Sequence, residues 1–379
     1  MGPVKIDSLI LREIRIRLRN PFETSFGKTW DRRIILVEVQ SDGLSGWGEV
    51  TAGEGPYYNP ETTDTSWLIL SKFIEPLVSG ASIASPGDLP RLMDPIRGHE
   101  MAKAALENAL WDIEAQRQGL PLSKLLGGTR SEIPCGVSIG IQSSPEALVD
   151  LIQRELAGGY QRIKIKIKPA KDLEFIQTVR KQFPSINLMV DANSAYRLED
   201  ADHLKRFDDY SLMMIEQPLA WDDIFDHSRL QSQLRTPVCL DESIHNAHHA
   251  NAALQIGACR VINVKLGRVG GHAEARCIEE LCRKSKIPVW CGGMLESGIG
   301  RAHNIAMSSL EGFVLPGDVS ASKRYWDEDI IDPEVDVSPQ GTIRVPARPG
   351  LGYTVRTHRI EQLTVRKEEF RSSSAQVPV

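Results

Sequence analysis

The stretch RIKIKIKP, residues 162–169, alternates isoleucine with lysine three times. Successive side chains of a β-strand point to opposite faces, so this pattern predicts a strand with an isoleucine face and a lysine face. A lysine face usually lies against solvent, which is the ordinary interpretation for an isolated strand. The rest of the sequence indicates which kind of sheet contains this strand, and therefore which way its lysines point.

Eight short apolar runs recur after residue 135, at a spacing of about 25 residues, which is the size of a βα unit. They are GVSIGI (136–141), IKIKIK (163–168), INLMVD (186–191), LMMIEQ (212–217), PVCLDE (237–242), RVINVK (260–265), IPVWCG (287–292) and GFVLPG (312–317). Helical patterns separate the runs, and eight such units predict a closed (β/α)8-type barrel. A doubly wound open sheet is the alternative, but no GxGxxG glycine motif follows any run.

The first third of the chain has a different pattern. Strand-like runs at 5–18, 33–40 and 46–50 are followed by helical patterns at 62–77 and 101–118. Asp42-Gly43 is a typical turn between two hairpin strands. This order predicts an α+β unit ahead of the barrel.

One charged residue stands near the carboxyl end of each of five consecutive runs. These residues are Lys166, Asp191, Glu216, Asp241 and Lys265, with successive differences of 25, 25, 25 and 24 positions. Solvated surface charges would not keep such register with apolar strands. The carboxyl ends of barrel strands form the floor of the active site, so these five residues predict a catalytic centre.

The order of the charges indicates the chemistry. Asp191, Glu216 and Asp241 follow adjacent runs, where three convergent carboxylates repel one another unless a cation lies between them. Oxygen ligands without His or Cys favour Mg²⁺ or Mn²⁺. Lys166 and Lys265 follow runs four places apart in a ring of eight, so they face each other across the mouth. This arrangement suits removal of a proton α to a carboxylate, and it turns the lysine face of residues 162–169 into the barrel.

The same residues carry a resemblance to a known family. The motifs are KxK at 164–166, DxN at 191–193, EQP at 216–218, DES at 241–243 and the single Lys265. Together they resemble the enolase superfamily, in its muconate-lactonizing subgroup. Stretches such as NPFETSFG (20–27) and GRVGGHAEAR (267–276) are similar to the family of o-succinylbenzoate synthases and N-acylamino acid (N-succinylamino acid) racemases. The similarity covers nearly the whole chain.

The resemblance implies a modified TIM barrel of (β/α)7β type with an N-terminal α+β capping domain that the C-terminal segment completes. We expect the capping domain over residues 1–130, the barrel over 131–325 and the returning segment over 326–379. Capping loops near 20–28 and 51–59 would set specificity, with the aromatic residues Phe22, Phe26, Tyr57 and Tyr58. Ordinary packing between the two domains is the other interpretation of these aromatic residues.

The resemblance also implies an activity. We expect a metal-dependent lyase that dehydrates 2-succinyl-6-hydroxy-2,4-cyclohexadiene-1-carboxylate to o-succinylbenzoate, a menaquinone precursor. Lys166 would be the general base and acid, with Lys265 stabilising the anion, and Mg²⁺ or Mn²⁺ would bind Asp191, Glu216 and Asp241. The alternative is an N-acylamino acid (N-succinylamino acid) racemase in which Lys265 is the second base. Lys164, beside Lys166 on the same face, is expected to favour the neutral form of that lysine.

Other residues have two interpretations each. Asn193 either orients substrate or caps local structure, and Glu242 is expected to support its neighbouring ligand. Ser138 either binds a substrate carboxylate or is satisfied by backbone. Arg268 either influences Lys265 or pairs with an acidic helix residue, and Gly293 and Met294 are expected to shape the pocket floor.

Composition excludes several classes. The net charge is −5 and no long basic run is present, so we expect neither nucleic-acid nor membrane partners but a small carboxylate substrate. Six cysteines without a CxxC pair indicate a reduced, cytoplasmic protein, which we expect to form a homo-oligomer. A Schiff-base aldolase and a barrel kept only for binding are further alternatives. The carboxylate triad argues against the aldolase, and the intact set of five charged positions argues against a barrel kept only for binding. A dipeptide epimerase is disfavoured because LPGDVS (315–320) lacks the DxD of that family.

Overall fold

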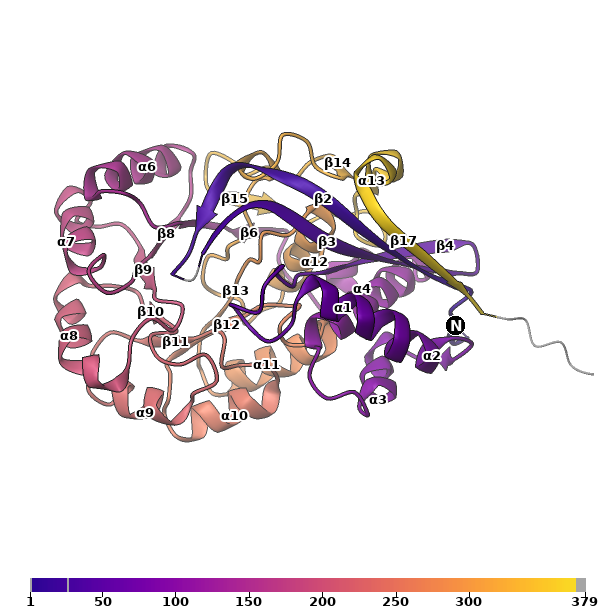
Figure 1. The fold of residues 1–379 in the computed structure, drawn as a ribbon, viewed down its shortest axis with the longest axis horizontal. Coiled ribbons are helices and arrows are strands. Elements are labelled where there is room, and N and C mark those ends of the chain that lie inside the picture. Colours follow the sequence, from indigo (N-terminus) through magenta and orange to yellow (C-terminus); the bar gives the residue numbers. More distant parts are fainter. Residues whose placement is uncertain (1, 26, 373–379) are drawn as a thin grey trace, which may run out of the picture.

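A computed structural model describes residues 2–25 and 27–372. Its centre is a parallel sheet of seven strands that follow one another in chain order around a curled wall (Figure 1). The strands are β7 (Gly136–Ile139), β8 (Arg162–Lys166), β9 (Leu188–Asp191), β10 (Ile215–Glu216), β11 (Val238–Leu240), β12 (Val261–Val264) and β13 (Val289–Cys291). Seven of the eight runs therefore form regular strands.

The eighth run, GFVLPG, is not a regular strand. It is held by isolated parallel bridges that pair Val289 with Phe313 and Cys135 with Gly317. Gly136 N donates to the carbonyl of Gly317 at 2.7 Å. This segment thus closes the ring between β13 and β7, but Pro316 has no N–H for a continuous ladder. The last run thus lacks the regular strand of the other seven, and the expected barrel of (β/α)7β type is confirmed.

Helices line the outside of the barrel (Figure 1). They are α6 (Pro145–Ala157), α7 (Leu173–Gln182), α8 (Ala201–Lys205), α9 (Phe225–Gln231), α10 (Ala247–Gln255), α11 (His272–Lys284) and α12 (Gly298–Ser308). Ile163, Ile165 and Ile167 are at most 1% exposed and belong to the same core cluster as Ile152 of α6 and Ile176 of α7. Each isoleucine buried in this way contributes about 1.5–3 kcal/mol. The isoleucine face of β8 therefore packs on the helices, as expected.

A four-stranded antiparallel sheet forms the cap, in the order β17-β2-β3-β4. Its strands are β2 (Ser8–Glu23), β3 (Lys28–Ser41), β4 (Leu44–Val50) and β17 (Thr364–Arg371). The predicted hairpin at Asp42-Gly43 is confirmed, with φ values of 49° and 77°. β2 and β3 reach further than predicted, because a register shift between Arg17 and Phe22 absorbs Pro21 and lets pairing resume beyond it.

The cap helices pack against this sheet. They are α1 (Thr63–Ile69), α2 (Glu75–Val78), α3 (Leu89–Met93), α4 (Glu100–Arg117) and α5 (Leu122–Leu125), with a π turn over Leu70–Ile74 between α1 and α2. The predicted helices at 62–77 and 101–118 are thus present. At Gly46 and Gly48 an added Cβ would lie 2.1 and 1.8 Å from carbonyl oxygens of Ala109 and Ala105. These two glycines allow α4 to lie directly on β4.

The last part of the chain contacts both units. It contains β14 (Ile331–Asp332), β15 (Thr342–Arg344), β16 (Thr354–Val355), α13 (Thr357–Leu363) and β17. β15 pairs with β6 (Glu132–Pro134) and β14 with β16, whereas β17 forms an edge of the cap sheet beside β2. The short strands β1 (Val4–Lys5) and β5 (Ser82–Ile83) pair with each other.

All six cysteines lie in the described residues and carry free thiols. Among those residues, no helix combines the length and apolar character needed to cross a bilayer.

Candidate active site

The five regularly spaced charges meet at the carboxyl ends of the barrel strands. Lys166 pairs in register with Asp191, and Asp191 with Glu216, on three neighbouring parallel strands. Asp191, Glu216 and Asp241 are completely buried, and Lys265 is 4% exposed. The barrel thus concentrates three carboxylates and two lysines at one end, as the spacing predicted.

Lys164 is bound on all sides by carboxylates. Its Nζ lies 2.9 Å from Glu216, 2.8 Å from Asp318 and 3.3 Å from Asp191. Burial alone would lower the pKa of Lys164, but the charges of these carboxylates outweigh it and hold the pKa well above its usual value. Lys164 therefore remains charged and acts as a fixed counter-ion beneath the site.

Asp318 is a functional-site residue that the sequence reasoning missed. It also binds Arg162 at 2.7 Å and accepts a hydrogen bond from Ser138 at 2.8 Å. A signal was available, because Asp318 directly follows the eighth apolar run, as the other carboxylates follow theirs. Ser138 is consequently satisfied by a carboxylate, which neither interpretation of that residue had included.

Lys166 belongs to a chain of polar side chains. Its Nζ donates to Asp191 Oδ2 at 2.5 Å and to Asn193 Oδ1 at 2.7 Å. Asn193 Nδ2 in turn donates to Glu242 Oε1 at 2.9 Å. Burial, with the neighbouring Asp241 charge, raises the pKa of Glu242 well above its usual value. Asn193 and Glu242 thus position the amine of Lys166.

Lys265 stands in a second cluster. Its Nζ lies 2.7 Å from Asp241 Oδ2, 3.2 Å from the Tyr58 hydroxyl and 4.4 Å from the centre of the Tyr58 ring. Arg268 binds Asp241 and donates to Tyr58 at 3.1 Å. Burial would raise the pKa of Asp241, but Lys265 and Arg268 outweigh it and hold that pKa below its usual value. Arg268 therefore pairs with the strand carboxylate rather than with a helix residue.

The carboxylates also have the chemistry of a cation site. Among the described residues, no three His, Cys, Asp or Glu side chains are already arranged as metal ligands, since these carboxylates bind lysine and arginine instead. Burial and the charge of Asp191 raise the pKa of Glu216 to about 7, which shows the cost of gathering these groups. A divalent cation would relieve this repulsion, and an all-oxygen donor set fits Mg²⁺ or Mn²⁺.

A cavity of about 500 Å³ opens over the two lysines. Its lining includes Lys166, Lys265, Asn193, Gly293, Met294, Phe22 and Tyr57. Tyr57 is 71% exposed, so the aromatic residue in contact with the catalytic cluster is its neighbour Tyr58. A smaller cavity of about 50 Å³ adjoins, and Ser138 lines this one. The predicted loop residue Phe26 lies outside the described residues.

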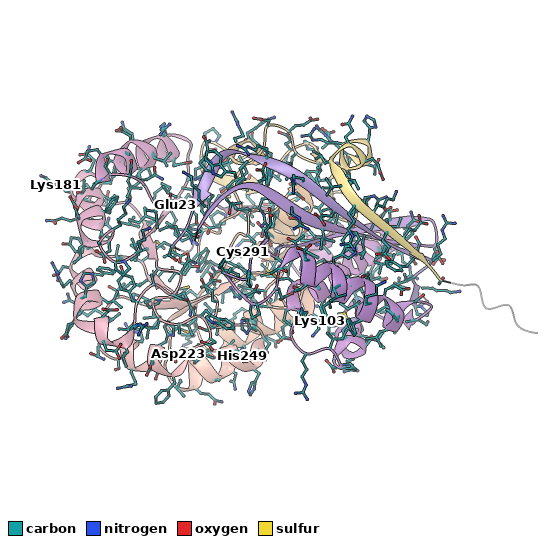
Figure 2. The ribbon with its side chains drawn as sticks, in the orientation of Figure 1. Glu23, Lys103, Lys181, Asp223, His249 and Cys291 are labelled. Atoms are coloured by element: carbon teal, nitrogen blue, oxygen red, sulfur yellow. The ribbon has the colours of Figure 1, made fainter. Side chains whose placement is uncertain are left out.

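The tip of the β2–β3 hairpin covers the barrel mouth. Figure 2 shows Glu23 at this tip, and its carbonyl accepts a hydrogen bond from Ile141 N at 3.1 Å. Ser25 Oγ donates to the carbonyl of Asn193 at 3.2 Å. The cap therefore touches the barrel next to Lys166.

Comparison with known proteins assigns the family. Residues 6–127 match the model of the mandelate racemase/muconate lactonizing enzyme N-terminal domain, and residues 147–359 match the enolase C-terminal domain-like model. The chain belongs to the enolase superfamily.

Individual relatives are similar over nearly their whole length. An o-succinylbenzoate synthase of Geobacillus kaustophilus is 52% identical over 95% of this chain and 96% of its own. An N-succinylamino acid racemase of Thermus thermophilus is 43% identical over 96% and 98%. The crystal structure of an enolase superfamily member from Listeria innocua has a TM-score of 0.94 at 42% identity, covering 97% of this chain and 99% of its own.

Proposed function

We propose that the protein is an o-succinylbenzoate synthase, a carbon–oxygen lyase that acts in the cytoplasm on a menaquinone precursor. The observation that carries this proposal is one cavity lined by two lysines, each hydrogen-bonded to a different strand carboxylate. The 52% identical relative named for this activity supports it. We also keep, as a proposal, the division into a cap (1–130), a barrel (131–325) and a returning segment (326–379).

Lys166 is the proposed acid–base residue. Its amine removes the ring proton α to the carboxylate, and the electron pair of the broken C–H bond forms the enolate. The resulting ammonium then protonates the hydroxyl that departs from the neighbouring carbon, so water leaves and the ring becomes aromatic. One lysine serves both steps because both events occur on one face of the ring.

Lys265 supplies positive charge from the other side of the cavity. Asp191, Glu216 and Asp241 would hold Mg²⁺ or Mn²⁺, which when bound stabilises negative charge on the substrate carboxylate. Lys164 contacts Asp191 and Glu216, and Arg268 binds Asp241, so these two cations hold the three carboxylates in place. Lys265 remains charged in the structure, since Asp241 outweighs the effect of burial and raises its pKa.

A racemase activity on N-succinylamino acids is the second candidate. Racemisation needs a base on each face of the α-carbon, and Lys265 provides the second one. The 43% identical racemase of Thermus thermophilus favours this candidate.

The test is an assay of both reactions on one preparation. We expect dehydration that stops with excess chelator and returns with Mg²⁺ or Mn²⁺, and that is lost in Lys166→Ala. Dehydration at full rate in excess chelator, or in Lys166→Ala, would contradict the assignment. No dehydration together with efficient racemisation would make the second candidate the function.

A further inference from the structure

Arg32 is a buried cation of the cap that the mechanism above does not use. We propose that Arg32 binds the distal carboxylate of the substrate, the one at the end of the succinyl chain, and so makes the site selective for succinyl compounds. This inference rests on the proposed function. Both candidate reactions act on molecules that carry this chain, whereas the lysines and the metal ligands deal only with the reacting end.

Arg32 lies on the face of β3 that looks into the site. It is paired in register with Ile16 of β2, and both Ile16 and Ile34 belong to the cluster that packs on the barrel. The side chain is 5% exposed and lines the same cavity of about 500 Å³ as Lys166 and Lys265. One cavity therefore has its acid–base groups on the barrel and a guanidinium on the cap.

The guanidinium lacks a counter-ion. Its Nη2 donates to the carbonyls of Thr51 and Ala52, each at 3.3 Å, and its Nε is buried without a hydrogen-bond partner. In residues 2–25 and 27–372, no carboxylate lies within 4.0 Å of Arg32. A buried cation without a partner is costly, and burial lowers the pKa of Arg32 despite the more distant carboxylates.

Two of those distant carboxylates are engaged elsewhere. Glu49 accepts hydrogen bonds from Ser297 N and Gly300 N at 3.0 Å, and Glu296 accepts from Met294 N and Asn304 Nδ2 at 2.9 Å. Glu54 is exposed on the loop after β4. Glu49 and Glu296 are thus engaged, and Glu54 forms no ion pair with Arg32 although it lines the same cavity, so a carboxylate that enters with the substrate meets a guanidinium without a close counter-ion.

Guanidinium suits this task because its planar donors match the two oxygens of a carboxylate. The alternative role is structural, since Arg32 also anchors the loop after β4 through two carbonyls. The two roles differ in one measurable respect. Loss of an anchor weakens every ligand, whereas loss of a carboxylate partner weakens only ligands with that carboxylate.

The test compares o-succinylbenzoate with its side-chain amide, in which the distal carboxylate becomes a neutral group of nearly the same shape. Calorimetry with Mg²⁺ present gives Kd for both ligands in the wild type, Arg32→Met and Arg32→Lys. The wild type should bind the acid more tightly than the amide by roughly 10- to 100-fold, the range of a charge-assisted hydrogen bond. Arg32→Met should bring this ratio close to one, and Arg32→Lys should restore part of it.

Arg15 provides the matched control. It lies on β2 next to β3, is exposed, and loses the same charge in Arg15→Met, which should leave the ratio unchanged. Equal binding of acid and amide by the wild type would overturn the inference, even if Arg32→Met failed to fold. An unchanged ratio in Arg32→Met would also overturn it, while dehydration by the wild type kept the proposed function intact. A wild type that neither dehydrates its substrate nor binds o-succinylbenzoate would reject both.

Discussion

The two lysines of the site have similar positions but different partners. Lys166 is held by Asp191 and Asn193, whereas Lys265 lies against Asp241 and the Tyr58 ring. Amide and carboxylate partners orient Lys166 for proton transfer. A carboxylate and an aromatic face hold a charge in place, which is what anion stabilisation requires.

The different partners predict different effects of substitution. Lys166→Ala should eliminate dehydration, because the base is gone. Lys265→Ala should reduce dehydration by about 10²–10³-fold, the usual loss of one well-placed stabilising charge. Lys265→Arg keeps the charge but not the basicity, so it should retain more dehydration than racemisation.

Deuterium exchange separates the two roles further. Lys265→Ala should still exchange the α-proton of one N-succinylamino acid enantiomer with solvent, through Lys166 alone. Near-normal dehydration in Lys166→Ala combined with its loss in Lys265→Ala would contradict this assignment, because the base would then be Lys265.

Adjacent tyrosines offer a matched comparison. The Tyr58 hydroxyl donates to Asp241 at 3.0 Å and accepts from Lys265, whereas Tyr57 is 71% exposed. Tyr58→Phe should lower kcat by about 10-fold or more, since the buried hydrogen bonds of the hydroxyl with Asp241, Lys265 and Arg268 are lost. Tyr57→Phe should change kcat less than twofold. Steady-state kinetics on both variants measures these changes. Equal effects on kcat would show that the hydrogen bonds of Tyr58 with the lysine cluster do not contribute to the reaction.

At the scale of the elements, a contact between two helices holds the cap on the barrel. Glu107 of α4 accepts hydrogen bonds from His272 N at 2.6 Å and Ala273 N at 2.9 Å, at the start of α11. It thereby ties the cap to a barrel helix. Burial raises the pKa of Glu107 from 4.5 to about 7, so the folded protein binds this proton more tightly than the unfolded chain.

This shift predicts how stability depends on pH. A carboxyl group with a raised folded-state pKa stabilises the protein below pH 4.5, and the contribution is lost as pH rises through 7. Glu107→Gln cannot lose that proton. As pH rises from 4 to 8, the unfolding free energy of the variant should therefore increase by up to about 3 kcal/mol relative to that of the wild type. Urea unfolding of both proteins at several pH values measures it, and a constant difference would contradict the shift.

Elements also show what could be predicted from sequence. The barrel and its five charges were predictable because one register repeats over consecutive βα units, as from Lys166 to Lys265. The eighth element was not, since GFVLPG has a strand-like composition but a proline within its ladder. The extension of the β2–β3 hairpin was missed for a similar reason: Pro21 suggested a loop where the sheet accommodates an irregularity.

Side-chain partners across the cap and barrel were beyond a periodic pattern. Tyr58 of the cap contacts Lys265 of the barrel, 207 positions away in sequence, and Arg32 of the cap lines one cavity with Lys166 and Lys265. Such contacts depend on how the two units dock. Spacing identified the charged residues that recur at the strand ends of the barrel, whereas the contacts between the cap and the barrel required the structure.

At the scale of the whole molecule, the proposed metal site would link chemistry to stability. A cation that binds only the folded protein stabilises it by about 2.7 kcal/mol at a concentration 100 times its Kd. Mg²⁺ should therefore raise the unfolding temperature of the wild type by a few degrees. In Asp191→Asn and Glu216→Gln the rise should be much smaller.

Differential scanning calorimetry with and without Mg²⁺ measures these shifts within each protein, so the intrinsic effect of each substitution cancels. The half-buried Asp226, on α9, provides a control through Asp226→Asn, which should keep the full shift. Equal shifts in all variants would show that Mg²⁺ acts somewhere other than at the strand carboxylates.

The pairing of β17 with β2 has a consequence for synthesis on the ribosome. Arg371 lies in register with Ser8, so the edge of the cap sheet receives its last strand only after all seven strands of the barrel have been translated. The seven strands of the barrel follow one another along the chain and are available earlier. Until then β2, the strand that carries the start of the hairpin over the active site, has one open edge. In a nascent chain the barrel strands are therefore complete before the cap sheet is. The exposed edge of β2 is where a chaperone or another nascent chain would first find unpaired backbone.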